Sequence, residues 1–224
     1  MNRISPKIFA EKSENPLSEA VQRAVSEGEA VEALEFERDS LSDVSCTELE
    51  FSSCRFKSVR FSDLDIGRIH FSDCKFVHCD LSGVAFRDGT LIRCIFTDCR
   101  MSGCVFDRML LRDTLLSDCA LRYASFSDSK LERCEWSGCD LSESMLFGIK
   151  PKQWTIARCK LNGAQLRECS LAGINLSDSE IENLSASAEA LRGATVSILQ
   201  APEVLSLFGV HILAWDCISA ESVI

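Results

Sequence analysis

The sequence lacks several features, and each absence narrows what the protein can do. No apolar run is long enough to span a membrane, and the N-terminal residues do not form a signal peptide. Zinc-type C-x-x-C spacings are absent, and the three histidines His70, His78 and His211 are scattered. No motif sets a nucleophile beside a base. We therefore expect a cytoplasmic protein that has no catalytic residues, metal site or cofactor and does not contact a membrane.

The sequence contains instead a regular period of five residues. A large apolar residue stands at every fifth position from Phe36 to Val196, with lapses at Pro151 and Ala186. Neither a helix, with its period of about 3.6, nor a flat strand, with its period of about 2, places every fifth side chain on one side. The period predicts a backbone that turns a corner once in each unit, so that the large side chains share one interior.

A second series of smaller residues stands two positions before the first, as at Leu49, Cys54 and Val59. Each unit thus holds a small inward residue, a spacer, a large inward residue and two polar residues. This pattern resembles the pentapeptide-repeat family, whose units read A(D/N)LXX. The resemblance implies an all-β solenoid, the right-handed quadrilateral β-helix, in which four units make one coil and residues twenty apart stack.

Stacking at twenty-residue spacing brings opposite charges together on the outside of such a coil. The position two after each large residue should point outward. One column at this position holds Glu48, Arg68, Asp88, Arg108 and Asp128, and another holds Asp73, Arg93, Asp113 and Arg133. Neighbouring coils lie roughly 4.8 Å apart, so the alternating signs predict cross-strand charge ladders. Because exposed ion pairs contribute little, we expect the ladders to set register more than stability.

The thirteen cysteines follow the same geometry. Eleven fall in the small inward series, which leaves only Cys46 and Cys217 outside it. Inward side chains on neighbouring coils have Cβ atoms near 4.8 Å apart, farther than the ~3.8 Å that a disulfide prefers. We interpret these cysteines as small core residues of a reducing compartment. A redox or metal-binding role is the alternative.

Both ends of the chain lie outside the period. The N-terminal segment should contain a short helix, opened by Asn15 and Pro16 and ended by Gly28, that caps the first coil. After the period, a capping box at Ser197 predicts a helix that runs to Phe208. The chain then divides into an N-terminal segment, the β-helix, a C-terminal helix with a strand, and a tail: residues 1–33, 34–196, 197–213 and 214–224.

The repeat weakens at 147–155, where Pro151 takes a large-residue position. Proline cannot donate to a strand ladder, so we expect one face to be irregular or bulged there. The irregularity is either a variation in packing or a recognition site. A basic cluster lies beside it, formed by Lys150, Lys152, Arg158 and Lys160.

Acidic residues gather near the N-terminus. Residues 11–50 hold twelve acids and three bases, a net charge of −9 out of −10 for the whole chain. Residues 51–224 hold 22 acids and 19 bases, so the body of the rod is nearly neutral.

The C-terminal end extends the resemblance to one branch of the family. Residues 191–196, 200–201 and 207–212 read LRGATV, QA and LFGVHI, which is similar to the end of the Qnr quinolone-resistance proteins. In that family a C-terminal helix and strand, here expected at 210–213, form a head-to-head dimer interface. A monomeric cap is the alternative, but a large apolar patch is costly to expose. The resemblance therefore implies a homodimer through Leu205, Phe208, Val210 and Ile212.

The resemblance implies binding rather than catalysis. Qnr proteins bind type II DNA topoisomerases, namely DNA gyrase or topoisomerase IV, and protect them from quinolones. Family members have been interpreted as mimics of B-DNA that occupy a basic groove. This chain resembles the loop-free branch, since its period is unbroken through 36–146, although its neutral body counts against simple DNA mimicry. We expect topoisomerase binding without direct nucleic-acid contact, and the alternative is a repeat scaffold that binds another protein along a flat face.

Overall fold

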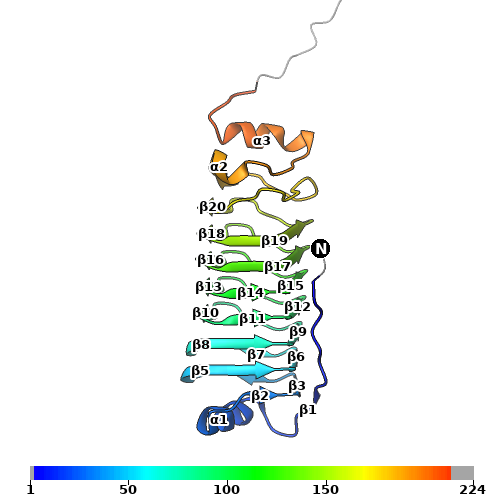
Figure 1. Ribbon diagram of the computed structural model, residues 1–224, viewed down its shortest axis with the longest axis vertical. Coiled ribbons are helices and arrows are strands. Elements are labelled where there is room, and N and C mark those ends of the chain that lie inside the picture. The colour runs from blue at the N-terminus through cyan, green and yellow to red at the C-terminus, as the bar shows by residue number, and fades with distance from the viewer. Residues whose placement is uncertain (1–2, 213–224) are drawn as a thin grey trace, which may run out of the picture.

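The chain forms a rod of parallel β-strands wound as a solenoid (Figure 1). The structure is a computed structural model that describes residues 3–212. Apart from the first short strand, every strand pairing joins residues twenty apart, such as Phe36 with Phe56 and Leu91 with Leu111. Four five-residue units therefore make one coil, which confirms the quadrilateral β-helix predicted from the sequence.

We name the four faces of the rod after one inward residue of each. Along the chain, every coil crosses the Leu91 face, the Phe96 face, the Leu121 face and the Phe106 face. Some long strands turn a corner and link neighbouring faces, so hydrogen bonding joins thirteen strands into one sheet. Its strands are β1 (Glu11–Lys12), β2 (Val31–Glu32), β3 (Leu34–Glu37), β5 (Val44–Ser52), β6 (Arg55–Lys57), β8 (Leu64–Ser72), β9 (Lys75–Val77), β11 (Thr90–Ile92), β12 (Ile95–Thr97), β14 (Leu110–Arg112), β15 (Leu115–Ser117), β17 (Lys130–Ser137) and β19 (Lys150–Ala157).

The other two faces carry shorter strands. The Leu121 face begins with the pair β4 (Ser40–Leu41) and β7 (Arg60–Phe61) and continues as isolated parallel bridges up to Lys160 with Glu180. The Phe106 face is a six-stranded sheet. Its strands are β10 (Ala85–Arg87), β13 (Val105–Asp107), β16 (Ser125–Ser127), β18 (Met145–Phe147), β20 (Gln165–Arg167) and β21 (Ser185–Ala186).

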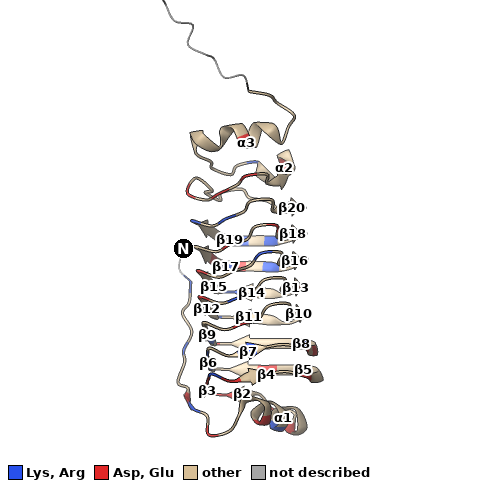
Figure 2. Ribbon diagram, turned by 180° about the vertical axis from the view of Figure 1, so that it is seen from behind, with Lys and Arg blue, Asp and Glu red and all other residues tan. Residues whose placement is uncertain are grey.

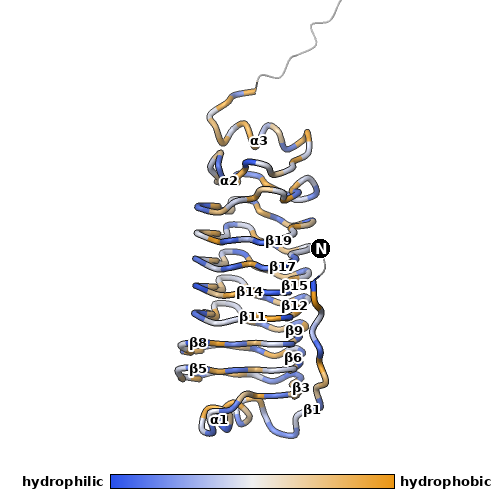
Figure 3. Tube along the Cα trace, viewed as in Figure 1, coloured by the Kyte–Doolittle hydropathy of each residue, from blue (hydrophilic) through white to orange (hydrophobic). Residues whose placement is uncertain are grey.

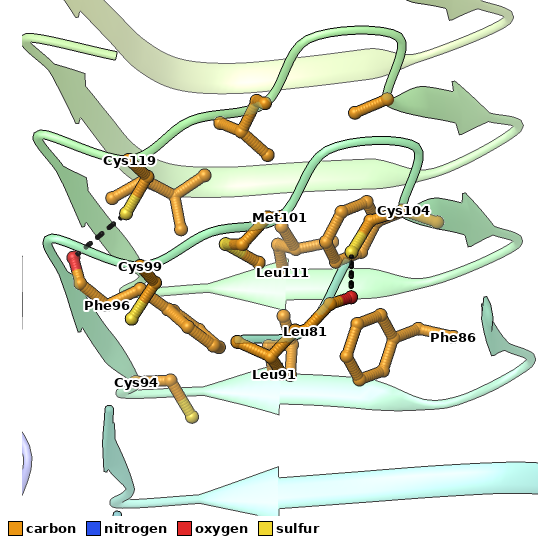
Figure 4. Close-up of a cluster of buried hydrophobic side chains, with 14 of the residues drawn as sticks. Leu81, Phe86, Leu91, Cys94, Phe96, Cys99, Met101, Cys104, Leu111 and Cys119 are labelled. Carbon is orange, nitrogen blue, oxygen red and sulfur yellow. Dashed lines mark hydrogen bonds between the residues drawn. The ribbon is translucent and has the colours of Figure 1, made fainter. Parts of the chain in front are cut away.

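The large residues of the period fill the interior of the rod. Side chains from successive faces meet there, as Leu81, Phe86, Leu91 and Phe96 do in Figure 4. Identical residues stack between coils, and the ring centroids of Phe76 and Phe96 lie 4.3 Å apart with nearly parallel planes. Such aromatic pairs contribute about 0.5–1.5 kcal/mol beyond the burial of their area. The repeated spacing therefore converts directly into a continuous core.

The corners of the coil require an unusual backbone conformation. Residues two after the large position adopt positive φ, as at Asp73 (52°), Arg93 (53°) and Asp113 (54°). Asp, Asn and Gly tolerate this left-handed region better than other residues. The recurrence of Asp at this position thus has a backbone cause as well as an electrostatic one.

The cysteines line the interior as predicted. All twelve in the described part of the chain are free, and eleven of them are buried. Most of the buried thiols reach a backbone carbonyl of the coil below, as Cys104 reaches Leu81 at 2.9 Å and Cys119 reaches Phe96 at 3.6 Å (Figure 4). Thr114 makes the equivalent bond through its hydroxyl. The small inward position therefore also satisfies a buried carbonyl, a role that the sequence analysis did not predict.

The N-terminal helix covers the first coil, as expected. Helix α1 (Leu17–Glu27) buries Leu17, Val21 and Ala24 and ends at Gly28, which has a φ of 68°. The predicted cap at Asn15 is wrong, because the first turn is satisfied from elsewhere. Asp39 accepts a hydrogen bond from the Leu17 N–H at 2.7 Å. The coil on which the helix packs thus supplies its cap.

Short helices close the other end of the rod. They are α2 (Ala188–Leu191), a 3-10 turn (Ile198–Gln200) and α3 (Ala201–Ser206). The capping box of Ser197 and Gln200 is confirmed, although the helix ends before Phe208. The predicted strand is not formed in 210–212, because no neighbouring strand is there to pair with it, and the predicted tail at 214–224 lies outside the described residues. No helix between residues 3 and 212 is long and apolar enough to cross a membrane.

Candidate interaction surfaces

The first predicted charge column lies at the corner between the Phe106 and Leu91 faces. Arg108 donates through Nε and Nη2 to the two carboxylate oxygens of Asp88, both at 2.7 Å. One pair lower, Arg68 Nη2 lies 3.3 Å from Glu48 Oε2. No ion pair within 4 Å joins Arg68 to Asp88, or reaches Asp128, in the described residues. The column therefore consists of separate pairs rather than a continuous ladder.

The second column lies at the corner between the Leu91 and Phe96 faces and has the same form. Arg133 donates through Nε and Nη2 to Asp113, both at 2.7 Å, and Arg93 Nε donates to Asp73 at 2.7 Å. In every pair the arginine stands one coil above its acid. These hydrogen bonds hold the pKa of Asp113 and of Asp73 below the usual aspartate value.

The N-terminal arm, residues 3–12, covers this second column. Figure 1 shows the arm running along the rod from β1 past β12 and β15. The N–H of Ile4 donates to Asp113 at 3.0 Å and the N–H of Lys7 donates to Asp73 at 2.9 Å. As a result the Asp113 side chain is only 2 % exposed. The second column thus lies on the outside of the coil, but the arm shields this corner from solvent, and nothing in the five-residue period signalled the arm.

The acidic end of the rod surrounds α1. A groove of about 320 Å³ between this helix and β5 is lined by Glu29, Glu48 and Glu50, with half-buried Cys46 at its wall. Red segments mark α1 and the neighbouring strands in Figure 2. The negative charge that the sequence concentrates in residues 11–50 is thus displayed at one end of the molecule.

Lysines gather on the Leu91 face farther along the rod, where β17 and β19 carry blue segments in Figure 2. Lys130 and Lys150 are direct register partners on these strands, and Lys152 follows on β19. All three are exposed, and none has an ion pair within 4 Å among the described residues. Glu132, which lies between them, is held by Arg112 at 2.8 Å. The structure therefore leaves three positive charges uncompensated on one face.

The basic cluster predicted from the sequence does not stay together. Arg158 donates to Ser137 at 2.8 Å, and Lys160 lies 3.6 Å from Glu180 on the Leu121 face. Only Lys150 and Lys152 belong to the Leu91 face, where Lys130 from the coil below joins them. Five-residue spacing carries successive residues around the corner, so neighbours in sequence are separated onto different faces.

The irregularity at Pro151 lies above its strand rather than within it. Strand β19 pairs with β17 along its whole length, including Leu131 with Pro151. The large inward residues of the Leu121 face show the bond that such a position normally makes. There the Leu121 N–H donates to the Asp140 carbonyl on the coil above, at 2.7 Å. Pro151 has no N–H to donate to the Ser170 carbonyl. The expected irregularity is therefore a missing backbone hydrogen bond between β19 and the coil above it. We call this gap the opened rung.

Two further residues widen this opened rung. The N–H of Asp113 donates to Glu132 one coil above, at 2.9 Å, but Gln153 makes no such bond to Ala172. Trp154 occupies a small inward position, packs edge-on against Trp136 with centroids 4.8 Å apart, and leaves its buried indole N–H without a partner. A cavity of about 250 Å³ opens here, lined by Pro151, Gln153, Trp154, Ser170, Ala172, Gly173 and Ile174.

The C-terminal module contains hydrophobic residues, which colour the trace orange in and after α3 in Figure 3, and several of them are exposed. The four residues expected at a dimer interface are 38–53 % exposed: Leu205, Phe208, Val210 and Ile212. Ile198 and Leu199 on the preceding turn are 85 % and 86 % exposed. Together they form an apolar end surface on an otherwise polar rod.

The described residues contain no group of three or more His, Cys, Asp or Glu side chains that could hold a metal ion. Several charged side chains at the corners are paired, and the interior is filled by apolar residues. Three surfaces stand out on the described part of the chain: the acidic end, the lysines of the Leu91 face with the opened rung, and the apolar end.

This architecture defines a parallel β-solenoid with a filled interior. Residues 69–146 match the family model described as a pentapeptide repeat region. The match covers about a third of the chain, and the twenty-residue register extends beyond it on both sides, so the chain resembles pentapeptide-repeat proteins in its repeat and its four-sided coil. No curated protein matches the sequence.

The chain is also similar to several solved structures. Trypsin-treated QnrB1, a plasmid-mediated fluoroquinolone resistance protein, is 22 % identical over 93 % of this chain and 98 % of its own, with a TM-score of 0.44. Full-length QnrB1 is 18 % identical over 80 % and 99 %, with a TM-score of 0.36. HetL, a pentapeptide-repeat protein involved in heterocyst differentiation regulation in the cyanobacterium Nostoc, is 14 % identical over 79 % and 89 %, with a TM-score of 0.31.

Proposed function

We propose that this chain is a non-enzymatic binding protein of the cytoplasm that binds a type II DNA topoisomerase, either DNA gyrase or topoisomerase IV, and protects it from quinolones. The observation that carries the proposal is a loop-free rod that ends in an apolar module. The sequence of this module, 191–212, is similar to the end of the Qnr proteins. The free thiols of the interior agree with a reducing compartment.

The apolar module supports a homodimer within this proposal. Leu205, Phe208, Val210 and Ile212 all lie at the end of the rod, beyond the last coil. A self-complementary contact there would join two rods head to head and bury side chains that are costly to leave in water. Such a dimer would have an acidic tip at each outer end.

The charge distribution decides which part of the rod could resemble DNA. The corner pairs neutralise one another, and Arg108 or Arg133 would repel a basic groove as much as Asp88 or Asp113 attracts it. Beside α1, by contrast, Glu29 and Glu50 have no ion pair within 4 Å among the described residues. We therefore place any mimicry of a phosphate backbone at the acidic end rather than along the body.

The proposal is tested with purified topoisomerase. A DNA-supercoiling assay with gyrase, run with and without a quinolone, should show supercoiling restored by the protein in the presence of drug. A variant that replaces Glu29, Glu48 and Glu50 by glutamine should lose this effect, whereas a variant that replaces Glu168 and Glu182 in the upper coils should keep it. The absence of any effect on gyrase and topoisomerase IV at high micromolar protein would remove the proposal.

A second function is favoured by a separate observation. Three unpaired lysines on the Leu91 face suit a scaffold that binds another protein of opposite charge along a flat surface. The two functions differ in their prediction for bacteria. Expression of the chain should raise quinolone tolerance in a susceptible strain under the first function and leave it unchanged under the second.

A further inference from the structure

We propose that the opened rung above β19 and the three lysines of the Leu91 face form one docking site for an acidic, extended protein segment. The inference concerns a surface that the topoisomerase proposal does not use. It therefore holds or fails independently of that proposal.

The lysines supply the charge of the site. Lys130 and Lys150 face each other across paired parallel strands. Like charges in directly opposite positions repel, and such pairs are normally avoided or neutralised. Elsewhere on this rod neighbouring coils do neutralise one another, as Arg55 does with Glu35 and Lys57 with Glu37. Arg55 also faces Lys75 in register, but Glu35 neutralises Arg55, whereas neither Lys130 nor Lys150 has an ion pair within 4 Å among the described residues.

The opened rung supplies hydrogen-bond donors next to these lysines. Gln153 lacks the backbone bond that its position makes on the coils below, and the indole N–H of Trp154 is buried without a partner. A buried donor without an acceptor is unfavourable, because it has lost its hydrogen bond to water and gained none in return. An oxygen acceptor brought in by a ligand would remove that cost, and a carboxylate oxygen is the acceptor that nearby lysines favour.

The cavity is large enough to receive a side chain. Its volume of about 250 Å³ is several times the roughly 30 Å³ that one water occupies in the liquid. Trp154 maintains the opening, because the same column holds Thr114 and Cys134 on the coils below, where the rungs are intact. An aspartate or glutamate side chain could therefore enter from the Leu91 face while its neighbours lie along the lysines.

The small extent of the charge favours a protein segment over a nucleic acid. The three lysines lie on two adjacent coils, and the whole chain carries a net charge of −10. Nucleic-acid sites usually engage about 6–10 phosphates with a corresponding number of basic residues. A short acidic segment matches three lysines and one cavity, whereas a duplex would meet acidic surface beyond them.

The test uses the full chain and a fluorescein-labelled peptide of eight glutamates, followed by fluorescence anisotropy at low salt. The peptide should bind saturably and weaken as salt is raised. The double variant Lys130→Glu/Lys150→Glu should weaken binding about tenfold or more. The matched control is Lys12→Glu/Lys75→Glu, two lysines that also lack an ion pair within 4 Å in the described structure, and it should bind like the parent.

A repaired variant measures what the opened rung contributes to peptide binding while the lysines stay unchanged. Pro151→Leu/Trp154→Thr restores the missing N–H and the small inward residue, and it should weaken peptide binding about fivefold while all lysines remain. Circular dichroism and thermal melting establish whether each variant folds. If the repaired variant does not fold, the surface lysine variant alone tests the docking site. Equal binding by the lysine variant and the parent would overturn the proposal. Tighter binding of a DNA oligonucleotide of equal charge would overturn it as well.

Discussion

The corner residues serve the backbone and the surface at the same time. Arg93, Arg108 and Arg133 adopt positive φ, which costs a non-glycine residue about 1–2 kcal/mol. An aspartate would tolerate that conformation better, so backbone preference does not explain the arginines. Each arginine instead forms a two-pronged bond to the aspartate of the coil below. At these positions the ion pair, rather than the turn, accounts for the residue type.

Two of these pairs have the same geometry but different surroundings, which allows a matched comparison. Arg133→Met should lower the melting temperature by about 5 °C, because it leaves the nearly buried Asp113 charge with only the Ile4 N–H as partner. Arg108→Met should lower it by less than about 2 °C, because Asp88 is 43 % exposed and water replaces the arginine. Thermal melting of the two variants measures the difference.

The pH dependence supplies the control for this comparison. Arg133 lowers the pKa of Asp113 below its usual value of 3.8, so the pair stabilises the fold above that pH. Its contribution is lost as the pH falls below 3.8 and through the lower pKa of the folded state. The gap between the parent and Arg133→Met should therefore close in strongly acidic buffer, and a gap independent of pH would point to lost packing.

The cysteines act as small hydrogen-bonding core residues, and their chemistry should reflect this. Burial raises the pKa of Cys94 and of Cys104 to about 12, so neither forms a reactive thiolate near neutral pH. In the native protein a thiol reagent such as DTNB should modify at most Cys46 and Cys217, and in denaturant it should modify all thirteen. Rapid native modification of the eleven interior thiols would contradict the structure.

Two elements of the rod depart from the repeat: strand β19 and the N-terminal arm. Strand β19 keeps its register with the coil below, so its large and small positions stay aligned despite Pro151 and Trp154. The arm is held by β1 and by two N–H bonds to corner aspartates rather than by apolar repetition. Both elements depend on contacts with other coils.

Pro151 gives an element-scale prediction about stability. Pro151→Leu restores a donor to the Ser170 carbonyl and a large inward side chain, so it should stabilise the rod by about 1 kcal/mol. Leu131→Pro on the coil below should destabilise it by about 3 kcal/mol, because that coil has an intact rung to lose. Urea unfolding measures both changes. A Pro151→Leu variant no more stable than the parent would mean that Trp154 alone keeps the rung open.

At the scale of the whole molecule, the chemical character of the surface changes along the axis of the rod. Carboxylates surround α1, unpaired lysines lie near β19, and apolar side chains occupy the end beyond the last coil. The corner pairs between them leave the middle nearly neutral. Three chemically different surfaces are therefore separated along one axis, as the elongated shape of a repeat rod allows.

The apolar end gives the prediction at this scale. Light scattering after size exclusion should give the mass of two chains for the parent and of one chain for Leu205→Asp/Phe208→Asp. Phe9→Asp is the matched control, since Phe9 is an 81 % exposed aromatic residue on the N-terminal arm, and it should remain a dimer. A monomeric parent at micromolar concentration would remove the proposed dimer and leave the β-helix intact.

The sequence alone was sufficient to predict the coil, the core and the free thiols, because each follows from the five-residue pattern that every unit repeats. It also predicted the capping box at Ser197 and Gln200, a local interaction over four residues. It was wrong about the cap of α1, where Asp39 comes from the next coil, and about the strand at 210–212. Both errors concern ends, where no repeat constrains the chain.

The period by itself determined which side chains point inward and which residues stack, since a five-residue unit leaves the backbone one register in which its apolar series is buried. Only the tertiary structure decided that the arm covers the corner of Asp73 and Asp113, and that the ladders divide into pairs. It also decided that Lys130 joins Lys150 and Lys152 while Arg158 and Lys160 turn away. These features depend on contacts between distant residues outside the repeat, or on which neighbour a charged side chain reaches first, and sequence spacing specifies neither.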